Sequence, residues 1–399
     1  MGYVSVSQTE TLNTAKNLIY KNPTAAIDLV ANYLDQDNYL SAKAYSITGK
    51  AYEVQGLYTT AYGAYAKGIN TLYGADTLDY YLEYAIFNNM AMIAFESNQY
   101  NMSSNLYGKA AEAAERYVKH DAGVAAYYNE QYLPNKMKFY QANAMYDAGD
   151  LDGALDIYLE LDKQFKTEVK DVNTYALLRN EYGLNAKAVK KLNDAEYYFN
   201  SIINMDKVSG YYKQSAMHNL ALVKMEMGDT LQALRCFNEA INLPGQGIVD
   251  KQRFISMMDK GELLLDMNKN KEAVHALHEA LALGVDIKHD LRLINIYYLL
   301  ERASKKLNLD KSDGYGDIYQ GMIASHIKRQ GEIISQEKAR VFHMALNEAK
   351  YNEKIEALKR SYSYRLFFNI VLFVAIAIVI TYLGVWCNIK LKIRRTITR

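Results

Sequence analysis

The sequence predicts an all-α protein that combines a helical repeat array, a long helix and one membrane-spanning helix. Three observations support this class: a pattern of small and aromatic residues recurs along the first 310 residues, prolines are rare, and one segment near the carboxyl end carries no charge over 21 residues. Only three prolines occur. Because proline removes an amide donor and clashes with the preceding turn, its scarcity leaves long stretches free to be helical.

Composition excludes several broad classes. The chain has 399 residues, with 46 basic and 45 acidic side chains and a formal net charge of +1. A nucleic-acid-binding domain is normally strongly basic, so we expect no nucleic-acid partner. Half of the residues are hydrophobic and 23% are charged, which excludes wholesale disorder. The two cysteines, Cys236 and Cys387, are too few for a disulfide framework.

The second helix of each predicted helix pair has a characteristic pattern. A small residue is followed four positions later by an aromatic residue or leucine, and usually three positions later by another small residue, as in Ala233, Phe237 and Ala240. These spacings place the residues on one helical face, where small side chains allow close approach. The first small residue of successive repeats is Ala26, Ala61, Ser103, Ala154, Ala195, Ala233 and Ala273.

The first helix of each pair has a pattern of its own. Tyr45, Gly49 and Tyr52 lie on one face, and Gly56 closes the turn that follows. A glycine after a helix adopts the left-handed conformation at little steric cost. Later repeats place Ala91, Ala142 and Ala221 at the close-contact position, and Gly149 and Gly228 in the turn.

These residues resemble the tetratricopeptide repeat (TPR), a helix–turn–helix unit of about 34 residues. The intervals between the small residues listed for the second helices are 35, 42, 51, 41, 38 and 40 residues, so we expect longer helices or loops than the family standard. The resemblance implies a right-handed superhelical solenoid over residues 1–310. It also implies a concave surface that binds peptides or partner helices.

Residues 311–365 form a predicted linker and juxtamembrane helix. The sequence at 308–317 is typical of a loop, and residues 317–365 predict one charged helix. A parallel coiled-coil stalk would pair this helix in a homodimer through Ile323–Tyr362. Packing of the same helix onto the last repeat as its cap is an equal alternative. The seam would consist of Ile323, Ile327, Ile334, Val341, Met344, Tyr351, Ile355, Leu358 and Tyr362.

The segment Leu366–Trp386 predicts a transmembrane helix. At 1.5 Å per residue its 21 charge-free residues match the hydrocarbon thickness of a bilayer. Tyr364, Tyr382 and Trp386 lie near its ends, where aromatic rings favour the headgroup layer. Residues 387–399 form a short basic tail. We therefore expect a membrane partner for this segment.

The side of the membrane stays open at this point. Five basic residues follow the span, and five more lie within the twenty residues before it, so the positive-inside comparison is nearly tied. The amino terminus shows no secretory signal. The layout of repeats, stalk and span resembles bacterial TPR membrane sensors, which implies a single-pass protein of the bacterial inner membrane. Only 13 residues follow Trp386, too few for an output domain.

Catalytic motifs are absent from the sequence. It contains no phosphate-binding loop, no H-E-x-x-H zinc helix and no G-x-S-x-G nucleophile elbow. His275 and His278 lie one helical turn apart without an evident third ligand, which favours a solvated pair over a metal site. Cys236 beside Phe237 is typical of a buried thiol. We expect no enzyme activity, no catalytic residue, no metal and no cofactor.

The resemblance to TPR proteins places a set of polar residues toward the concave groove. It implies a membrane-anchored, non-enzymatic protein that binds a protein or peptide there, as a scaffold does. The alternative is the sensor subunit of a bacterial signalling or transcription-regulatory system whose output domain lies on another chain. The candidate partner-binding residues are Lys43, Lys50, Asn88, Lys136, Asn143, Asn180 and His218.

Overall fold

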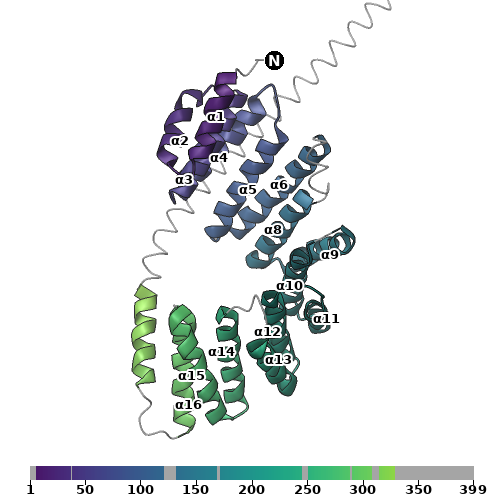
Figure 1. The fold of residues 1–399 in the computed structure, drawn as a ribbon, viewed down its shortest axis with the longest axis vertical. Coiled ribbons are helices and arrows are strands. Elements are labelled where there is room, and N and C mark those ends of the chain that lie inside the picture. The colour runs from purple at the N-terminus through teal and green to yellow at the C-terminus, as the bar shows by residue number, and fades with distance from the viewer. Residues whose placement is uncertain are drawn as a thin grey trace, which may run out of the picture. The chain divides into compact units, whose positions relative to one another are not determined.

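The fold is all-α in every part of the chain that can be described. A computed structural model describes residues 6–36, 38–120, 132–168, 171–244, 250–287, 290–307 and 314–328. All regular structure within these ranges is helical, which confirms the predicted class for them (Figure 1). None of the helices described there is both long and apolar enough to cross a membrane. The predicted domain boundary near residue 310, the segment Leu366–Trp386 and the basic tail lie outside the described ranges.

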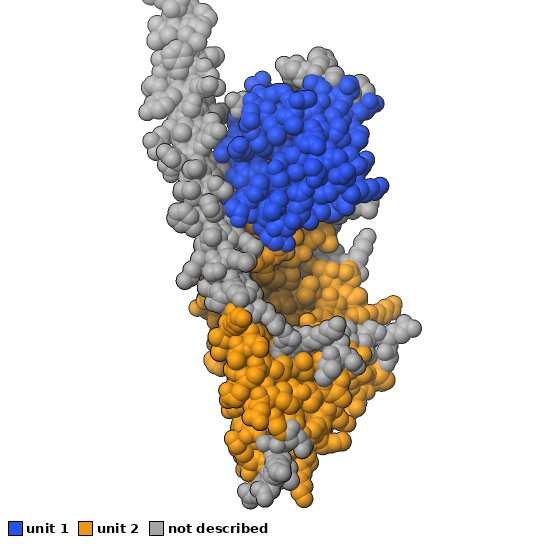
Figure 2. All heavy atoms as spheres, turned by 90° about the vertical axis from the view of Figure 1, so that its left-hand side faces the viewer, with its two compact units in different colours: residues 1–78, 342–399 blue, residues 79–341 orange. Residues whose placement is uncertain are grey.

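The chain divides into two compact units, residues 1–78 with 342–399 and residues 79–341 (Figure 2). In the first unit the described residues form two helix pairs and one short 3₁₀ helix. The first pair is α1 and α2, and the second is α3 and α4. The bounds are α1 Val6–Leu18, α2 Pro23–Val30, the 3₁₀ helix Ala31–Tyr33, α3 Tyr39–Val54 and α4 Tyr58–Gly74.

The second unit continues the same architecture. Its bounds are α5 Tyr80–Glu96, α6 Tyr100–His120, α8 Tyr132–Ala148, α9 Leu151–Glu168, α10 Val172–Ala188, α11 Leu192–Ile203, α12 Gly210–Glu226, α13 Thr230–Asn242, α14 Asp250–Asp266, α15 Asn270–Ile287 and α16 Asp290–Lys306. A further helix covers residues 315–328. Each first helix packs on the second helix that follows it, from α5 on α6 to α14 on α15.

First helices of neighbouring pairs also touch one another. α10 contacts α8 and α12, and α14 contacts α12 and α16, whereas α11 is flanked by α10 and α12. When neighbouring helix pairs contact one another through their first helices, the stack of pairs is concave on that side. These first helices therefore line the inner edge of the second unit.

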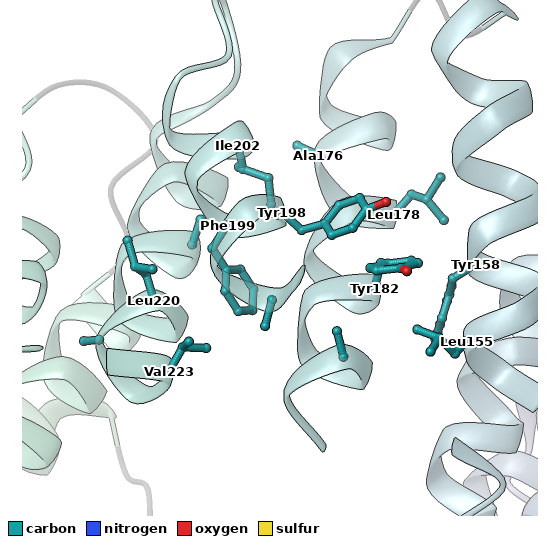
Figure 3. Packing of buried hydrophobic residues seen from close by; sticks show 14 of the residues in the cluster. Leu155, Tyr158, Ala176, Leu178, Tyr182, Tyr198, Phe199, Ile202, Leu220 and Val223 are labelled. Carbon is teal, nitrogen blue, oxygen red and sulfur yellow. The ribbon is translucent and has the colours of Figure 1, made fainter. Parts of the chain in front are cut away.

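The small residues predicted for the second helices lie in the core, as expected. All seven of them, from Ala26 to Ala273, are fully buried. The residue four positions later is buried with the small residue in all seven, as Tyr65, Tyr158 and Phe237 illustrate. Figure 3 shows this packing in the centre of the second unit, where Tyr158, Tyr182 and Phe199 fill the space between successive pairs. The sequence pattern therefore predicts the core correctly.

Glycine is required where first and second helices approach most closely. A Cβ added to Gly49 would lie 2.7 Å from the ring of Tyr65, and one added to Gly183 would lie 2.8 Å from the ring of Phe199. Such separations are shorter than real carbon contacts, so the two helices come closer than an alanine would allow. The predicted turn glycine Gly56 has a φ of 75°, in the left-handed region.

The helix of residues 315–328 starts on the last helix pair. Tyr315 is buried in the same cluster as α14, α15 and α16, and its hydroxyl lies 3.2 Å from Nε2 of His278. The ring of Tyr319 contacts the ring of Tyr298 on α16. The first turns of this helix thus cover the end of the repeat array, as the cap alternative predicts. The helix begins two residues before the predicted start.

Candidate functional site

Polar side chains on the first helices of successive pairs form the strongest candidate site. They lie where α8, α10, α12, α14 and α16 approach one another on the inner edge of the second unit. We call this set the inner row. It consists of Asn143, Asp147, Asn180, Glu181, His218, Asn219, Ser256, Asp259 and Arg292.

Amide groups join α10 to α12 in the middle of the inner row. Asn219 Nδ2 donates to Asn180 Oδ1 at 2.9 Å, and Asn180 Nδ2 donates to Glu181 Oε1 at 3.2 Å. Asn180 thereby uses both ends of its amide within the row. One level earlier, the hydroxyl of Tyr158 donates to Asn143 Oδ1. Asn143 and Asn180, two of the predicted residues, are thus each hydrogen-bonded to a side chain of a neighbouring helix.

Two carboxylates lie together where α8 meets α10. Burial raises the pKa of Glu181, and the neighbouring charge of Asp147 raises it further. Burial also raises the pKa of Asp147. Both carboxylates add to the effect of burial in raising the pKa of Tyr146 and Tyr158. The charges of Asp147 and Glu181 thus act in the same direction as burial on the ionisation of both phenols.

His218 is buried where α12 meets α14. Its Nδ1 lies 3.1 Å from the hydroxyl of Ser256, and its Nε2 lies 3.5 Å from Asp259 Oδ2. The Ser256 hydroxyl donates to the carbonyl of Gln252, so the hydrogen between Ser256 and His218 belongs to Nδ1. The lone pair of Nε2 then faces Asp259. Burial lowers the pKa of His218 to about 4 and raises the pKa of Asp259 to about 6.

A Ser–His–Asp grouping suggests acyl transfer, but its geometry here does not fit that chemistry. A nucleophilic hydroxyl must reach the substrate and give its proton to the histidine. The side chain of Ser256 has no exposed surface, and its proton is directed to a backbone carbonyl. The grouping therefore joins two helices and presents no nucleophile.

Arg292 extends the inner row to α16. Its positive charge contributes to lowering the pKa of His218 on α12 and opposes the rise in the pKa of Asp259 on α14. Lys187 is the other cation that influences His218, and it is paired with Glu226 at 3.2 Å.

The remaining predicted residues lie elsewhere. On α3 in the first unit, Lys43 Nζ lies 4.4 Å from the centre of the Tyr39 ring, and Lys50 forms an ion pair with Glu53. In the second unit, Asn88 Nδ2 on α5 approaches the sulfur of Met92 at 3.9 Å. The exposed Lys136 of α8 lies 5.9 Å from the ring centre of Tyr140. Each makes local contacts within its own helix.

Sequence reasoning missed six members of the inner row, namely Asp147, Glu181, Asn219, Ser256, Asp259 and Arg292. A usable signal existed for some of them. Asn219 lies 39 residues after Asn180, and Ser256 lies 38 residues after His218, close to the local repeat length. Adding one repeat length to the position of His218 would have placed Ser256 and its neighbours on the inner edge. Glu181 directly follows a residue that was selected.

The other sequence candidates behave as structural residues. Cys236 is buried, and burial raises the pKa of its thiol to about 11, as expected for an inert core cysteine. His275 and His278 are both exposed, as expected for a solvated pair, and Nε2 of His278 also lies 3.2 Å from the hydroxyl of Tyr315. Across the described ranges no group of three or more potential metal ligands is found.

Comparisons with known proteins support the fold. No protein-family model matches the chain, and no curated protein matches it. The solved structure of the apo form of the quorum sensor NprR from B. thuringiensis matches with a TM-score of 0.54 and 14% identity, covering 81% of this chain and 89% of that chain. Aspartyl phosphate phosphatase F from Bacillus subtilis matches with a TM-score of 0.52 and 14% identity, covering 90% of this chain and 96% of that chain.

A third structure, the apo form of RapI, has a TM-score of 0.51 and 15% identity, and covers 73% of this chain and 99% of that chain. At this level of identity the likeness concerns the fold alone. The described chain has a TPR-like helical repeat fold.

Proposed function

We propose that this chain is a non-enzymatic binding protein that holds a peptide, or an extended segment of a partner protein, along the inner row. The observation that carries the proposal is the row of polar side chains on the first helices from α8 to α16, with contacts that join α10 to α12 and α12 to α14. The amide and carboxylate groups of this face that are not fully buried suit an extended main chain, whereas His218 and Ser256 hold α12 and α14 together. Stacked repeats commonly use their concave side in this way.

The surroundings of the inner row suit binding better than catalysis. Tyr140 and Tyr146 on α8 are half-buried and supply flat amphipathic surface, which is favoured in contacts with peptides. One similar structure is named a quorum sensor, which is a signal-responsive role. Another is named a phosphatase, but the buried hydroxyl of Ser256 in this chain supports a structural role for its Ser–His–Asp grouping.

All seven residues selected from the sequence belong to this proposal. Asn143, Asn180 and His218 act within the inner row. Asn88 and Lys136 would act as additional contacts on first helices of the second unit, and Lys43 and Lys50 would act as contacts of the first unit.

Photo-crosslinking tests the proposed face. A p-benzoylphenylalanine side chain replaces Tyr146 on the inner edge or, as the control, Tyr197 on the second helix α11, which is 59% exposed. Both changes keep an aromatic ring, so neither should disturb folding. With a fluorescent pool of random decapeptides, we expect adducts from position 146 and few from position 197. Equal labelling at the two positions would contradict the inner-face assignment.

We further propose that Leu366–Trp386 anchors the repeats in a bacterial inner membrane. The proposal is supported by the length of the charge-free segment and by its flanking aromatic and basic residues. Anchoring would confine the repeats at the membrane and raise the local concentration of a membrane-associated partner. Protease treatment of intact cells and of spheroplasts would assign the side that carries the repeats. Protection in both preparations would place them in the cytoplasm.

The sensor alternative has one supporting observation. Ile327, a predicted seam residue, is 64% exposed on the helix of residues 315–328, and Ile323 is only half-buried. An exposed apolar side chain on this helix suits pairing with a second copy. A Cys at position 327, in a chain with Cys387 changed to Ser, would give a disulfide-linked dimer in membranes. A monomer under oxidising conditions would argue against the dimeric stalk.

A further inference from the structure

One exposed leucine departs from the pattern of the second helices. In the other repeats the residue two positions before the small core residue is polar, namely Thr24, Thr59, Asn101, Asp152, Asn193 and Lys271. In α13 the same position holds Leu231, whose side chain is 70% exposed. A single exposed apolar side chain is ordinary on a protein surface. The neighbours of Leu231 therefore decide whether it belongs to a binding surface.

These neighbours line an open hollow of about 680 Å³ along α13. Its lining contains two rows of side chains with a spacing of four residues. The first row is Leu231, Arg235, Glu239 and Leu243, and the second is Leu234, Asn238 and Asn242. Rows with this spacing are the ridges through which α-helices pack on one another, and the space between two ridges accepts a ridge of the other helix. The surface of α13 thus has the form that a second helix fills.

The first row carries two opposite charges that are not neutralised within the described part of the chain. Arg235 and Glu239 are both exposed and lie one helical turn apart, yet neither forms an ion pair with another residue that the structure describes. The corresponding residues of α15 are His275 and Glu279, and there Nε2 and Oε1 lie 3.6 Å apart. Along the first row of α13 the order is therefore apolar, positive, negative, apolar, with both charges available to a partner.

This order is complementary to itself in the antiparallel direction. When a two-fold axis relates two copies of α13, the start of the row in one copy faces its end in the other. Leu231 then meets Leu243 of the second copy. Arg235 likewise meets Glu239 of the second copy, and each contact occurs twice because a two-fold interface repeats every contact. Charge complementarity thus identifies a second copy of this chain as the partner.

We propose that α13 binds α13 of a second copy of this chain through the groove between its two rows. The contact goes beyond the proposed function, because α13 is a second helix and the inner row lies on first helices. It is also separate from the predicted stalk at Ile323–Tyr362. One helix from each copy gives a small contact compared with the roughly 1,200–2,000 Å² buried in stable complexes, so we expect a weak dimer.

Resonance energy transfer between full-length chains tests the contact. Copies labelled at the amino terminus with a donor or an acceptor are mixed in detergent and titrated. Arg235→Glu places glutamate against glutamate, and Glu239→Arg places arginine against arginine, so either change should raise the dissociation constant about tenfold. Leu231→Lys introduces the residue that α15 carries and should also weaken the dimer. Glu279→Arg on α15 is the matched control and should leave the dissociation constant unchanged.

A mixture of the two charge variants tests the antiparallel order. A chain with Arg235→Glu carries two negative charges in the row, and a chain with Glu239→Arg carries two positive charges. Each variant should pair poorly with itself, whereas the mixture should give at least the energy transfer of the wild type. The double variant restores the opposite charges and should pair with itself. Recovery of pairing in the mixture would also show that both variants are folded.

Three results would overturn the proposal. The first is a wild type whose energy transfer does not rise with concentration, which would leave the groove of α13 for a different partner. The second is unchanged transfer in both single charge variants, which would place the dimer contact on another surface, such as the stalk. The third is a mixture of the variants that pairs no better than either variant alone. None of these results bears on peptide binding along the inner row.

Discussion

His218 and Asp259 are buried in the same contact between α12 and α14, and folding shifts their titration in opposite directions. His218 has a folded pKa of about 4 against 6.5 in the unfolded chain, because burial and the charges of Arg292 and Lys187 disfavour the imidazolium. Its contribution to stability is complete above pH 6.5 and is lost as pH falls toward 4. Burial and Glu262 raise the pKa of Asp259 from 3.8 to about 6, against the effect of Arg292. Its contribution is complete below pH 3.8 and is lost as pH rises toward 6.

Because the two contributions oppose each other between pH 4 and 6, single substitutions should reveal them. Asp259→Asn leaves the histidine alone, so the variant should lose stability relative to the wild type as pH falls from 6 to 4. His218→Gln leaves the aspartate alone and should gain relative stability over the same range. Urea unfolding at several pH values, expressed as the difference from the wild type, measures both. Parallel pH profiles for the two variants would show that these groups do not carry the linkage.

Gly183 is the second residue whose effect is predictable from local geometry. An alanine Cβ there would lie 2.8 Å from two ring carbons of Phe199, so Gly183→Ala should destabilise the second unit by about 1–3 kcal/mol. Ala221 occupies the corresponding position of α12, so the cost reflects the spacing of α10 and α11 in particular. Gly321→Ala, where nothing lies within 4 Å, is the control and should be neutral or slightly stabilising. Thermal unfolding of the purified chain compares the two, and equal melting temperatures would contradict the close packing.

At the scale of the helices, Tyr315 attaches the helix of residues 315–328 to the last helix pair. Its ring is buried against the last pair, and its hydroxyl lies 3.2 Å from Nε2 of His278. Tyr315→Ala should open α15 and α16 to solvent, and Tyr315→Phe, which keeps the ring, should cost only about 1 kcal/mol. Because each repeat contacts only its neighbours, the loss should remain local.

Amide hydrogen exchange would show this locality. In the Tyr315→Ala variant, exchange should accelerate in α15 and α16 while α8 and α10 keep the protection of the wild type. Uniform acceleration throughout the second unit would indicate that the cap stabilises the whole array cooperatively. No change in α16 would show that the helix of residues 315–328 is not a cap.

The helices and their core were predictable because they depend on periodic patterns. The small residue of each second helix and the glycines at positions 56, 149 and 228 follow from spacing and backbone conformation. The turns after three other first helices were not predicted from glycine. There Asn98, Lys190 and Asn268 adopt left-handed φ angles without being glycine. At Lys190 the ion pair with Glu226 at 2.7 Å helps to offset a conformation that the sequence alone would not suggest.

At the scale of the whole molecule, the inner row could be predicted only in part. Family resemblance selected Asn143, Asn180 and His218 from their positions on first helices. The acidic and basic residues beside them were not predicted, because the desolvation of a charged group and the absence of a counter-ion depend on how α8, α10 and α14 approach one another. A repeat register predicts which face a residue occupies, whereas its electrostatic environment requires the packed structure. Glu181 therefore differs from the other glutamates only in the packed structure, where burial raises the pKa of its carboxyl.

Membrane attachment is a property of the whole chain and has a direct test. If Leu366–Trp386 spans the bilayer, two arginines near its centre, Ala375→Arg and Ile378→Arg, should prevent stable insertion. Each arginine adds about 2.5–3.5 kcal/mol to the cost of insertion, which together outweighs the gain of a few apolar residues. The full-length wild type should remain in the pellet after carbonate extraction, and the double variant should be released. Ala375→Leu with Ile378→Leu is the matched control and should stay in the pellet. Release of the wild type itself would show that the charge-free segment packs against protein, and it would remove the anchor from the proposed function while leaving the inner row unaffected.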